Sequence, residues 1–258
     1  MRRDLLSVFF SIVFLALVHT AFSVDQQFAA CEPKNCGNGL NISYPFWIQN
    51  NHPDYCGYPG FRVFCRNSKP ILRVSNSDYI LQDIFYRNQS FLVINTGAID
   101  NSCPAPLHNF TITGAPYEFG QNIVRLLILY NCTTSFSDEY PVLCNTDPSL
   151  HSFAMLLPWE EFDYSIYSSK CSVVVDAPVE LDGKLSSEAI AQRNYVLFLR
   201  NGFVLKWTID ECINCLRSGG RCGFDKGEFV CFCSDHPHSK HCNNGKSTKF
   251  NLFTSFAF

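Results

Sequence analysis

Residues 212–242 read CINCLRSGGRCGFDKGEFVCFCSDHPHSKHC, which places six cysteines within 31 positions at the spacing C-x2-C-x6-C-x8-C-x-C-x8-C. Glycines lie between these cysteines, and so short a stretch buries too little apolar surface to fold on a hydrophobic core alone. Small modules of this composition are held together by disulfides. The spacing therefore predicts a disulfide-stapled module at residues 211–242, followed by an unstructured tail at residues 243–258.

The chain as a whole has the composition of a folded protein. Of its 258 residues, 47% are hydrophobic and only 17% are charged, and the formal net charge is −3. The hydrophobic fraction is ample for a core, which argues against intrinsic disorder. A near-neutral charge balance also argues against a nucleic-acid partner, because proteins that bind nucleic acids neutralise several phosphates with clustered lysines and arginines.

The first 23 residues have the three parts of a secretory signal peptide. These are a short basic start, an uncharged apolar run from Leu5 to Val18, and the small-x-small pattern of Ala21 to Ser23. An uncleaved signal anchor is the alternative, but the apolar run is shorter than the roughly 20 residues that span a bilayer. We therefore expect residues 1–23 to be removed and the mature chain to be extracellular.

Secretion decides how the cysteines are interpreted. In an oxidising compartment, 14 cysteines are most simply seven disulfides. A zinc site through Cys212 and Cys215, or through His236, His238 and His241, is disfavoured because such thiols are oxidised there. We predict no metal and no cofactor.

Four N-glycosylation sequons fit the same secretory route and lie between residues 41 and 133. Their acceptor asparagines should lie on the surface. They are Asn41, Asn88, Asn109 and Asn131.

Two further regions precede the cysteine-rich module. Residues 31–97 consist of short apolar runs split by Gly, Pro and Asn, and the alternation at residues 61–64 and 71–74 is typical of half-buried strands. This region has six Lys and Arg against four Asp and Glu, whereas residues 98–210 have six against thirteen. We place a domain boundary between Asn95 and Cys103, where the charge balance and the pattern of short apolar runs change together.

The second region, residues 98–210, also favours β-structure. Strand candidates lie at residues 125–130, 152–157 and 171–175. One helix is expected from Ala189 to Arg200, capped at residues 186–188 and stopped by Asn201 and Gly202, with Ile190, Tyr195 and Phe198 near one face. The predicted fold is therefore mainly β and disulfide-rich, with two small β-domains, one or few short helices and the cysteine-rich module at the end.

Two cysteine-anchored motifs carry a family resemblance. Residues 36–46 (CGNGLNISYPF), residues 56–61 (CGYPGF) and Cys65 resemble the galacturonan-binding domain of plant wall-associated receptor-like kinases. Residues 202–207 (GFVLKW), followed by residues 212–223 (CINCLRSGGRCG), resemble the C-terminal domain of the same receptors. Together they are similar to the whole extracellular region of the leaf-rust-resistance-locus branch of these kinases.

The resemblance also has implications for the disulfides. The order of cysteines in the last module resembles an EGF-like module, which implies the pairs Cys212–Cys222, Cys215–Cys231 and Cys233–Cys242. The other eight cysteines would then pair among themselves, and several pairings stay open. They are Cys31, Cys36, Cys56, Cys65, Cys103, Cys132, Cys144 and Cys171.

For function, the resemblance implies binding of a pectin or oligogalacturonide-like polysaccharide without chemical change. Full-length relatives are single-pass plasma-membrane kinases, whereas this sequence ends at Phe258 and has no glycine-rich phosphate loop, His-Arg-Asp or Asp-Phe-Gly motif. We expect no enzyme activity and a location in the cell wall or apoplast. A soluble form could act as a decoy or a partner of membrane receptor kinases.

The chemistry of an acidic polysaccharide selects the candidate site. Cations must meet its carboxylates, and arginine suits them because its planar fork donates two parallel hydrogen bonds. Aromatic faces can pack against sugar C–H groups, although many aromatics near the motif should belong to the core. The relatives often have Gly where Trp47 stands, so this residue adds an aromatic surface. The candidate ligand-binding residues are Tyr44, Phe46, Trp47, Tyr58, Arg62, Arg66, Lys69 and Arg73.

Two other classes of function stay open. In the first, the EGF-like module and the acidic middle region bind a peptide or co-receptor, and the first domain is only a scaffold. In the second, Glu160, Glu161 or Asp163 serve a wall hydrolase. That chemistry needs two facing carboxyl groups about 5 or 9 Å apart, which neighbours on one loop rarely provide.

Overall fold

The computed structural model describes residues 24–74, 76–100, 108–136, 140–142, 151–158, 163–181, 189–190, 192, 194–209 and 211–243. The expected signal peptide, Cys103, Cys144 and the tail beyond residue 243 lie outside these ranges. The fold is mainly β, with few short helices and several disulfides, which confirms the predicted fold class. No helix within the described ranges is long and apolar enough to cross a membrane.

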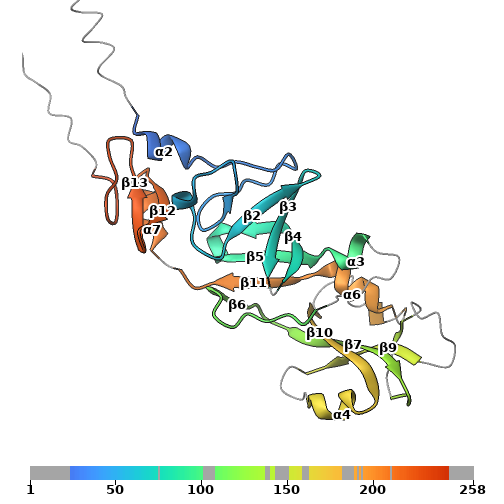
Figure 1. Ribbon diagram of the computed structural model, residues 1–258. Coiled ribbons are helices and arrows are strands. Elements are labelled where there is room, and N and C mark those ends of the chain that lie inside the picture. The colour runs from blue at the N-terminus through green and yellow to red at the C-terminus, as the bar shows by residue number, and fades with distance from the viewer. Residues whose placement is uncertain are drawn as a thin grey trace, which may run out of the picture.

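A seven-stranded sheet forms the centre of the molecule (Figure 1). Its strands are, in spatial order, β1 (Trp47–Ile48), β2 (Arg62–Arg66), β3 (Lys69–Val74), β4 (Ser77–Phe85), β5 (Ser90–Asn95), β11 (Phe203–Trp207) and β6 (Tyr117–Phe119). The strands are antiparallel neighbours, except that β1 and β2 are parallel. At the β2–β3 hairpin, Asn67 and Ser68 have φ of 50° and 59°, as the tight turns of two-residue hairpins require.

One face of this sheet is the core of the first domain. Val63, Leu72 and Tyr79 are adjacent in the strand register and are buried. Behind them, Phe46 and Phe61 pack edge to face with their ring centroids 5.0 Å apart. Because side chains alternate along a strand, the neighbours of these buried residues face the opposite side of the sheet. That outer side carries the charged residues of β2 and β3.

The central sheet includes strands from both sides of the boundary expected between Asn95 and Cys103. β11 pairs with β5 over Phe203 to Lys206, and β6 extends the sheet on the far side of β11. Tyr117, Leu205 and Trp207 therefore belong to the same core as Phe46 and Phe61. The expected range of 31–97 thus corresponds to only part of this sheet, because strand pairing across more than a hundred residues leaves no local signal.

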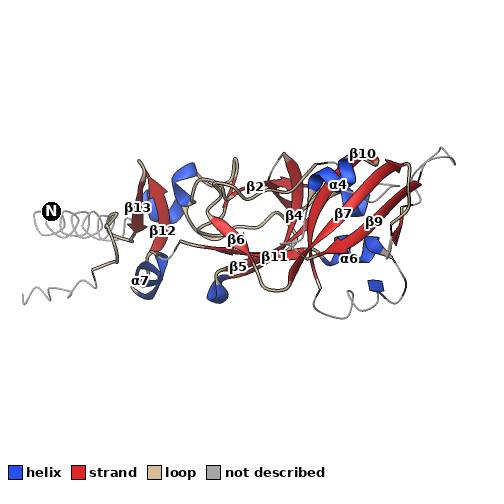
Figure 2. Cartoon of the chain, turned by 90° about the horizontal axis from the view of Figure 1, so that it is seen from below, coloured by secondary structure: helices blue, strands red, loops and turns tan. Residues whose placement is uncertain are grey.

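A second, four-stranded sheet lies at one end of the molecule (Figures 1 and 2). Its order is β10 (Cys171–Glu180), β7 (Ile123–Cys132), β9 (His151–Leu157) and β8 (Tyr140–Pro141). The expected strands at 125–130, 152–157 and 171–175 all lie within it. The short helices before the cysteine-rich module include α2 (Gln26–Ala30), η1 (Asp54–Cys56), η2 (Tyr86–Asn88), α3 (Gly97–Asp100), α4 (Tyr164–Ser168) and α6 (Tyr195–Asn201).

Helix α6 differs from its prediction. It begins at Tyr195, where the Asn194 side chain accepts a hydrogen bond from the Val196 amide at 3.1 Å. The expected cap at residues 186–188 lies outside the described ranges. Tyr195 and Phe198 are buried as expected, but Ile190 lies before α6 and is 53% exposed. Residues 189, 190 and 192 are also helical, and Ala189 is buried in the same core as Tyr195 and Phe198. The expected helix is therefore present on both sides of Asn194, and Ile190 is the residue that does not lie on its buried face.

The cysteine-rich module packs against the start of the described chain at the end opposite the second sheet (Figure 2). It contains α7 (Cys212–Arg217), β12 (Arg221–Asp225) and β13 (Glu228–Phe232). The Arg221 guanidinium donates to the Phe28 carbonyl at 2.5 Å, and its central carbon lies 4.2 Å from the centre of the Phe28 ring. Tyr55 packs on Phe232 with ring centroids 5.3 Å apart. The module is thus joined to the first domain by packing as well as by the chain.

Candidate functional site

A basic surface forms on the outer side of β1, β2 and β3, and we call it the arginine face. Its members are Trp47, Arg62, Phe64, Arg66, Lys69 and Arg73. The strand register places Trp47 beside Arg62, and Arg66 beside Lys69. The guanidinium carbons of Arg62 and Arg73 lie 5.0 and 6.0 Å from the centre of the Phe64 ring. Phe64 therefore supports two arginines from neighbouring strands.

Asp78 of β4 orients two of these arginines. Its carboxylate accepts from Arg73 Nε at 2.8 Å and lies 3.1 Å from Arg66 Nη2. The two arginine side chains are 58% and 60% exposed, whereas that of Asp78 is 15% exposed. The hydrogen bond from Arg73 lowers the pKa of Asp78, so the carboxylate stays charged in mild acid. With four cations and one anion, the face has a local formal charge of +3.

Trp47 forms one wall of a depression on this face. The depression has a volume of about 320 Å³ and is also lined by Gly60, Arg62, Phe64 and Arg73. It combines an indole ring with two guanidinium groups, which are the groups that an acidic sugar needs. The arrangement can bind a carboxylate beside an aromatic surface.

The position of Trp47 depends on Gly57. A methyl group added at Gly57 would overlap the Trp47 ring, and the Gly57 backbone is extended with φ of −140°, so alanine there causes no backbone strain. We expect Gly57→Ala to push the indole outward and change its fluorescence emission and its quenching by iodide. The same substitution made in a Trp47→Phe chain should leave the remaining tryptophan emission unchanged. A change in tryptophan emission in both the native and the Trp47→Phe chain would show that Gly57→Ala acts on a tryptophan other than Trp47.

Three of the candidate residues do not lie on the arginine face. Phe46 is fully buried in the core. Tyr44 and Tyr58 pack against the cysteine-rich module, with ring centroids 6.0 Å from Phe229 and 4.6 Å from Phe224. The structure therefore brings together Trp47, Arg62, Arg66, Lys69 and Arg73 and separates the other aromatics from them.

Phe64 and Asp78 are site residues that the sequence interpretation missed. The sequence contains a signal for each of these two residues. Phe64 lies between Arg62 and Arg66 at strand spacing, and Asp78 follows Arg73 by five residues across a short hairpin. Cross-strand neighbours of opposite charge commonly pair in this way.

Three of the sequon asparagines are exposed. They are Asn41, Asn88 and Asn109, whereas Asn131 is half-buried. The side-chain oxygen of Asn109 accepts from the Asp176 amide at 3.0 Å. Glycosylation takes place at the amide nitrogen, so this hydrogen bond leaves the acceptor atom available.

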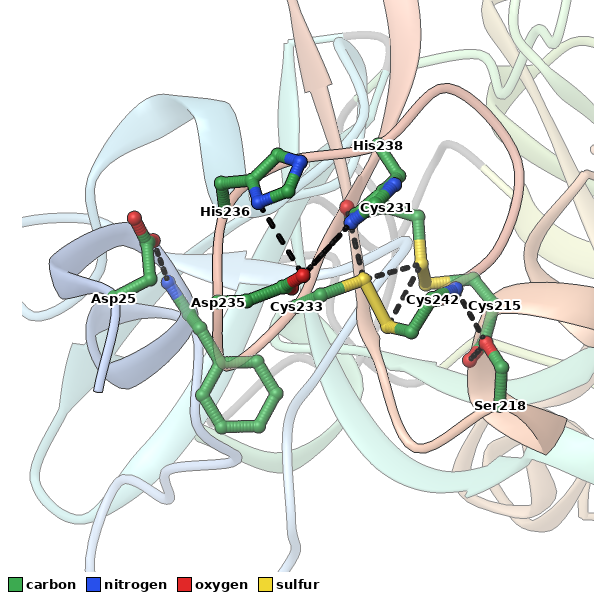
Figure 3. Close-up of a disulfide and its surroundings, with 10 residues drawn as sticks. Asp25, Cys215, Ser218, Cys231, Cys233, Asp235, His236, His238 and Cys242 are labelled. Atoms are coloured by element: carbon green, nitrogen blue, oxygen red, sulfur yellow. Dashed lines mark hydrogen bonds and ion pairs between the residues drawn. A yellow bond between two sulfur atoms is a disulfide. The ribbon is translucent and has the colours of Figure 1, made fainter. Parts of the chain in front are cut away.

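The described cysteines form six disulfides. They are Cys31–Cys56, Cys36–Cys65, Cys132–Cys171, Cys212–Cys222, Cys215–Cys231 and Cys233–Cys242. The last three follow the order that the EGF-like resemblance implies. The disulfides Cys215–Cys231 and Cys233–Cys242 lie next to a cluster of two histidines and one aspartate (Figure 3). In this cluster, His236 Nδ1 and His238 Nε2 lie 3.3 and 3.4 Å from the Asp235 carboxylate. Cys233 lies close to this cluster but is a half-cystine, so it offers no thiolate there.

Of the three acidic residues considered as candidates for a hydrolase, only Asp163 is among the described residues, and it has a structural role. Asp163 caps α4, accepting from the Ser165 amide at 2.9 Å and from the Ser165 hydroxyl at 2.7 Å. These hydrogen bonds lower its pKa. Glu160 and Glu161 lie outside the described residues.

Two parts of the chain match known protein-family models. Residues 31–95 match the model for the wall-associated receptor kinase galacturonan-binding domain, and residues 133–236 match the model for the wall-associated receptor kinase C-terminal domain. The arginine face lies entirely within the first match. No solved structure matches the chain significantly.

Curated relatives come from Arabidopsis thaliana. The chain is 38% identical to leaf rust 10 disease-resistance locus receptor-like protein kinase-like 1.2, over 94% of this chain and 38% of that protein. It is 26% identical to the kinase-like 2.1 protein, over 92% of this chain and 39% of that protein. RING-H2 finger protein ATL22 is 24% identical over 92% of this chain and 62% of its own length. The chain thus spans about two fifths of the two receptor-like kinases.

Proposed function

Because this chain has the two-domain extracellular organisation of the wall-associated and leaf-rust-10-type receptor kinases, we propose that it binds de-esterified pectin on the arginine face, without chemical change. The observation that carries the proposal is the convergence of Arg62, Arg66 and Arg73 beside Trp47. Pectin fragments present repeated carboxylates, which guanidinium groups bind through paired hydrogen bonds. The indole offers a flat surface for the sugar ring.

The same relatives support a proposal for the location and the biological setting. Domains of this type are extracellular in receptor kinases, so the arginine face would meet cell-wall polysaccharide directly. We propose that binding contributes to cell-wall sensing or defence signalling, either as the outer part of a receptor kinase or in a soluble form that competes with such receptors for the same polysaccharide.

The proposal is tested by retention of the mature chain on immobilised de-esterified pectin. Retention should occur at low salt and decline as ionic strength rises, because the face is exposed and its charges are screened within about 10 Å at 0.1 M salt. Fully methyl-esterified pectin, which has no carboxylates, is the matched control. Equal retention on both materials, or none on either at low salt, would contradict the proposal.

Asp78 is expected to lower the affinity of the arginine face for pectin. Its carboxylate already occupies Arg66 and Arg73, so a pectin carboxylate must compete with it. We expect Asp78→Asn to strengthen binding of a de-esterified oligogalacturonide several-fold and to steepen its salt dependence, as measured by titration calorimetry. Asp83→Asn removes the same charge from β4 away from these arginines and serves as the control. Weaker binding by Asp78→Asn would show instead that orientation of the arginines matters more than competition.

A further inference from the structure

A second candidate site lies where the cysteine-rich module meets the first sheet. Two depressions of about 580 and 750 Å³ share Glu211 and Phe224 in their walls, and we refer to the two together as the groove. These volumes fall within the usual range of about 300 to 1,000 Å³ for ligand sites. None of the residues that line this groove belongs to the arginine face.

The larger depression has the chemistry of a cation site. Glu211 is the one charged residue among its described lining residues, and the rest are mainly apolar or aromatic. The ion pairs found among the described residues do not involve Glu211, so its carboxylate is available. The Tyr58 and Phe224 rings beside it lie 4.6 Å apart at an angle of 55°. Aromatic faces attract cations, and a neighbouring carboxylate strengthens that attraction.

A tyrosine with a buried hydroxyl group packs against residues that line this groove. Tyr44 is 8% exposed, and its hydroxyl has no hydrogen-bond partner among the described residues. The Tyr44 ring belongs to the same apolar cluster as Tyr58 and Phe224. Burial raises the pKa of Tyr44, and the Glu211 carboxylate raises it further, so the phenol stays protonated and can donate. An unsatisfied buried donor is uncommon in folded proteins, so this hydroxyl marks the packing beside Glu211 as unusual.

The charges in the groove select among ligands. Glu211 and Glu228 both line the smaller depression, and Lys240 lies there as well, which leaves the groove with a net charge of −1. An acidic polysaccharide is repelled by this charge, whereas a positively charged peptide is attracted. Because Lys240 does not line the larger depression, the cation belongs there, next to Glu211.

We propose that this groove binds a cationic peptide segment, with an arginine side chain held between the Glu211 carboxylate and the rings of Tyr58 and Phe224. The molecule would then have two separate recognition surfaces of opposite charge, one for an acidic polysaccharide and one for a basic peptide. Because no residue is shared, the second surface does not depend on the function proposed for the first.

The test uses an acetylated and amidated tetra-arginine peptide as the probe, with the tetra-citrulline peptide as an uncharged control of nearly the same shape. Binding to the mature chain is followed by fluorescence anisotropy of labelled peptides at fixed ionic strength. We expect the citrulline peptide to bind at least about tenfold more weakly. Glu211→Gln should weaken arginine-peptide binding about five- to tenfold, whereas Glu32→Gln, an exposed carboxylate outside the groove, should change it less than twofold.

A second variant separates recognition from folding. Phe224→Leu keeps an apolar side chain but removes the aromatic face, and it should weaken binding several-fold while the three disulfides of the module still form. Retention on de-esterified pectin should be unchanged in Glu211→Gln. Equal binding of the arginine and citrulline peptides, equal losses in Glu211→Gln and Glu32→Gln, or no arginine-peptide binding at low salt would each overturn the proposal.

Discussion

Replacement of Arg62, Arg66 and Arg73 by glutamate is expected to abolish binding of the mature chain to de-esterified pectin. The three guanidinium groups are the main cations of the arginine face, and each exchange replaces an attraction for a carboxylate with a repulsion. Charge-assisted hydrogen bonds of this kind act together on a ligand that carries repeated carboxylates. We expect the affinity to fall by at least about 100-fold at low salt, as measured by calorimetry with an oligogalacturonide.

A matched control is needed because the triple variant also changes the net charge. Reversal of Arg87, Arg217 and Lys226 changes the charge equally, and these exposed residues lie outside the arginine face. We expect this control to weaken binding only a few-fold, through long-range repulsion that salt screens. If both triple variants lose binding equally, the arginine face is not the binding site.

Gly220→Ala is expected to prevent the cysteine-rich module from folding. A methyl group at Gly220 would lie 2.5 Å from Cys231 Sγ and 2.7 Å from both Cys215 Sγ and Cys242 Sγ, so it would overlap atoms of two disulfides. Loss of a native disulfide from a small secreted domain costs about 2 to 5 kcal/mol. We expect the secreted yield to collapse and non-reducing peptide maps to show scrambled pairs.

The neighbouring glycine provides the control. Gly219 has φ of +81°, and a methyl group there would meet no atom within 4 Å. Gly219→Ala therefore carries only the left-handed backbone penalty of about 1 to 2 kcal/mol. A secreted yield for Gly220→Ala as high as that for Gly219→Ala would show that the disulfide core tolerates the added group.

The strands and the basic surface were predictable because both follow local patterns. The alternation at residues 61–64 indicates a half-buried strand, and in the structure Val63 lies in the core whereas Arg62 is exposed. The short β2–β3 hairpin then brought Arg66 and Lys69 side by side. No contact between distant parts of the chain was needed for these inferences.

The roles of Tyr44 and Tyr58 were not predictable in the same way. Both lie near the motif in the sequence, but the cysteine-rich module, more than 150 residues later, covers Tyr44 and packs against Tyr58. The pairing of β5 with β11 was not predictable for the same reason, because these strands are also far apart in the sequence. Local patterns define the exposed face of a strand, whereas long-range packing decides which aromatic residues remain available to a ligand.

Pectin binding at the arginine face is tested most directly by an NMR titration of the mature chain with a de-esterified oligogalacturonide. The signals to follow are the indole N–H of Trp47 and the side-chain Nε–H groups of Arg62, Arg66 and Arg73. We expect these signals to shift together and saturate, while the signals of the buried Trp207 indole and of the amides around Glu211 stay unchanged. Shifts confined to other surfaces, or no shift at low salt, would contradict the assignment of pectin binding to the arginine face.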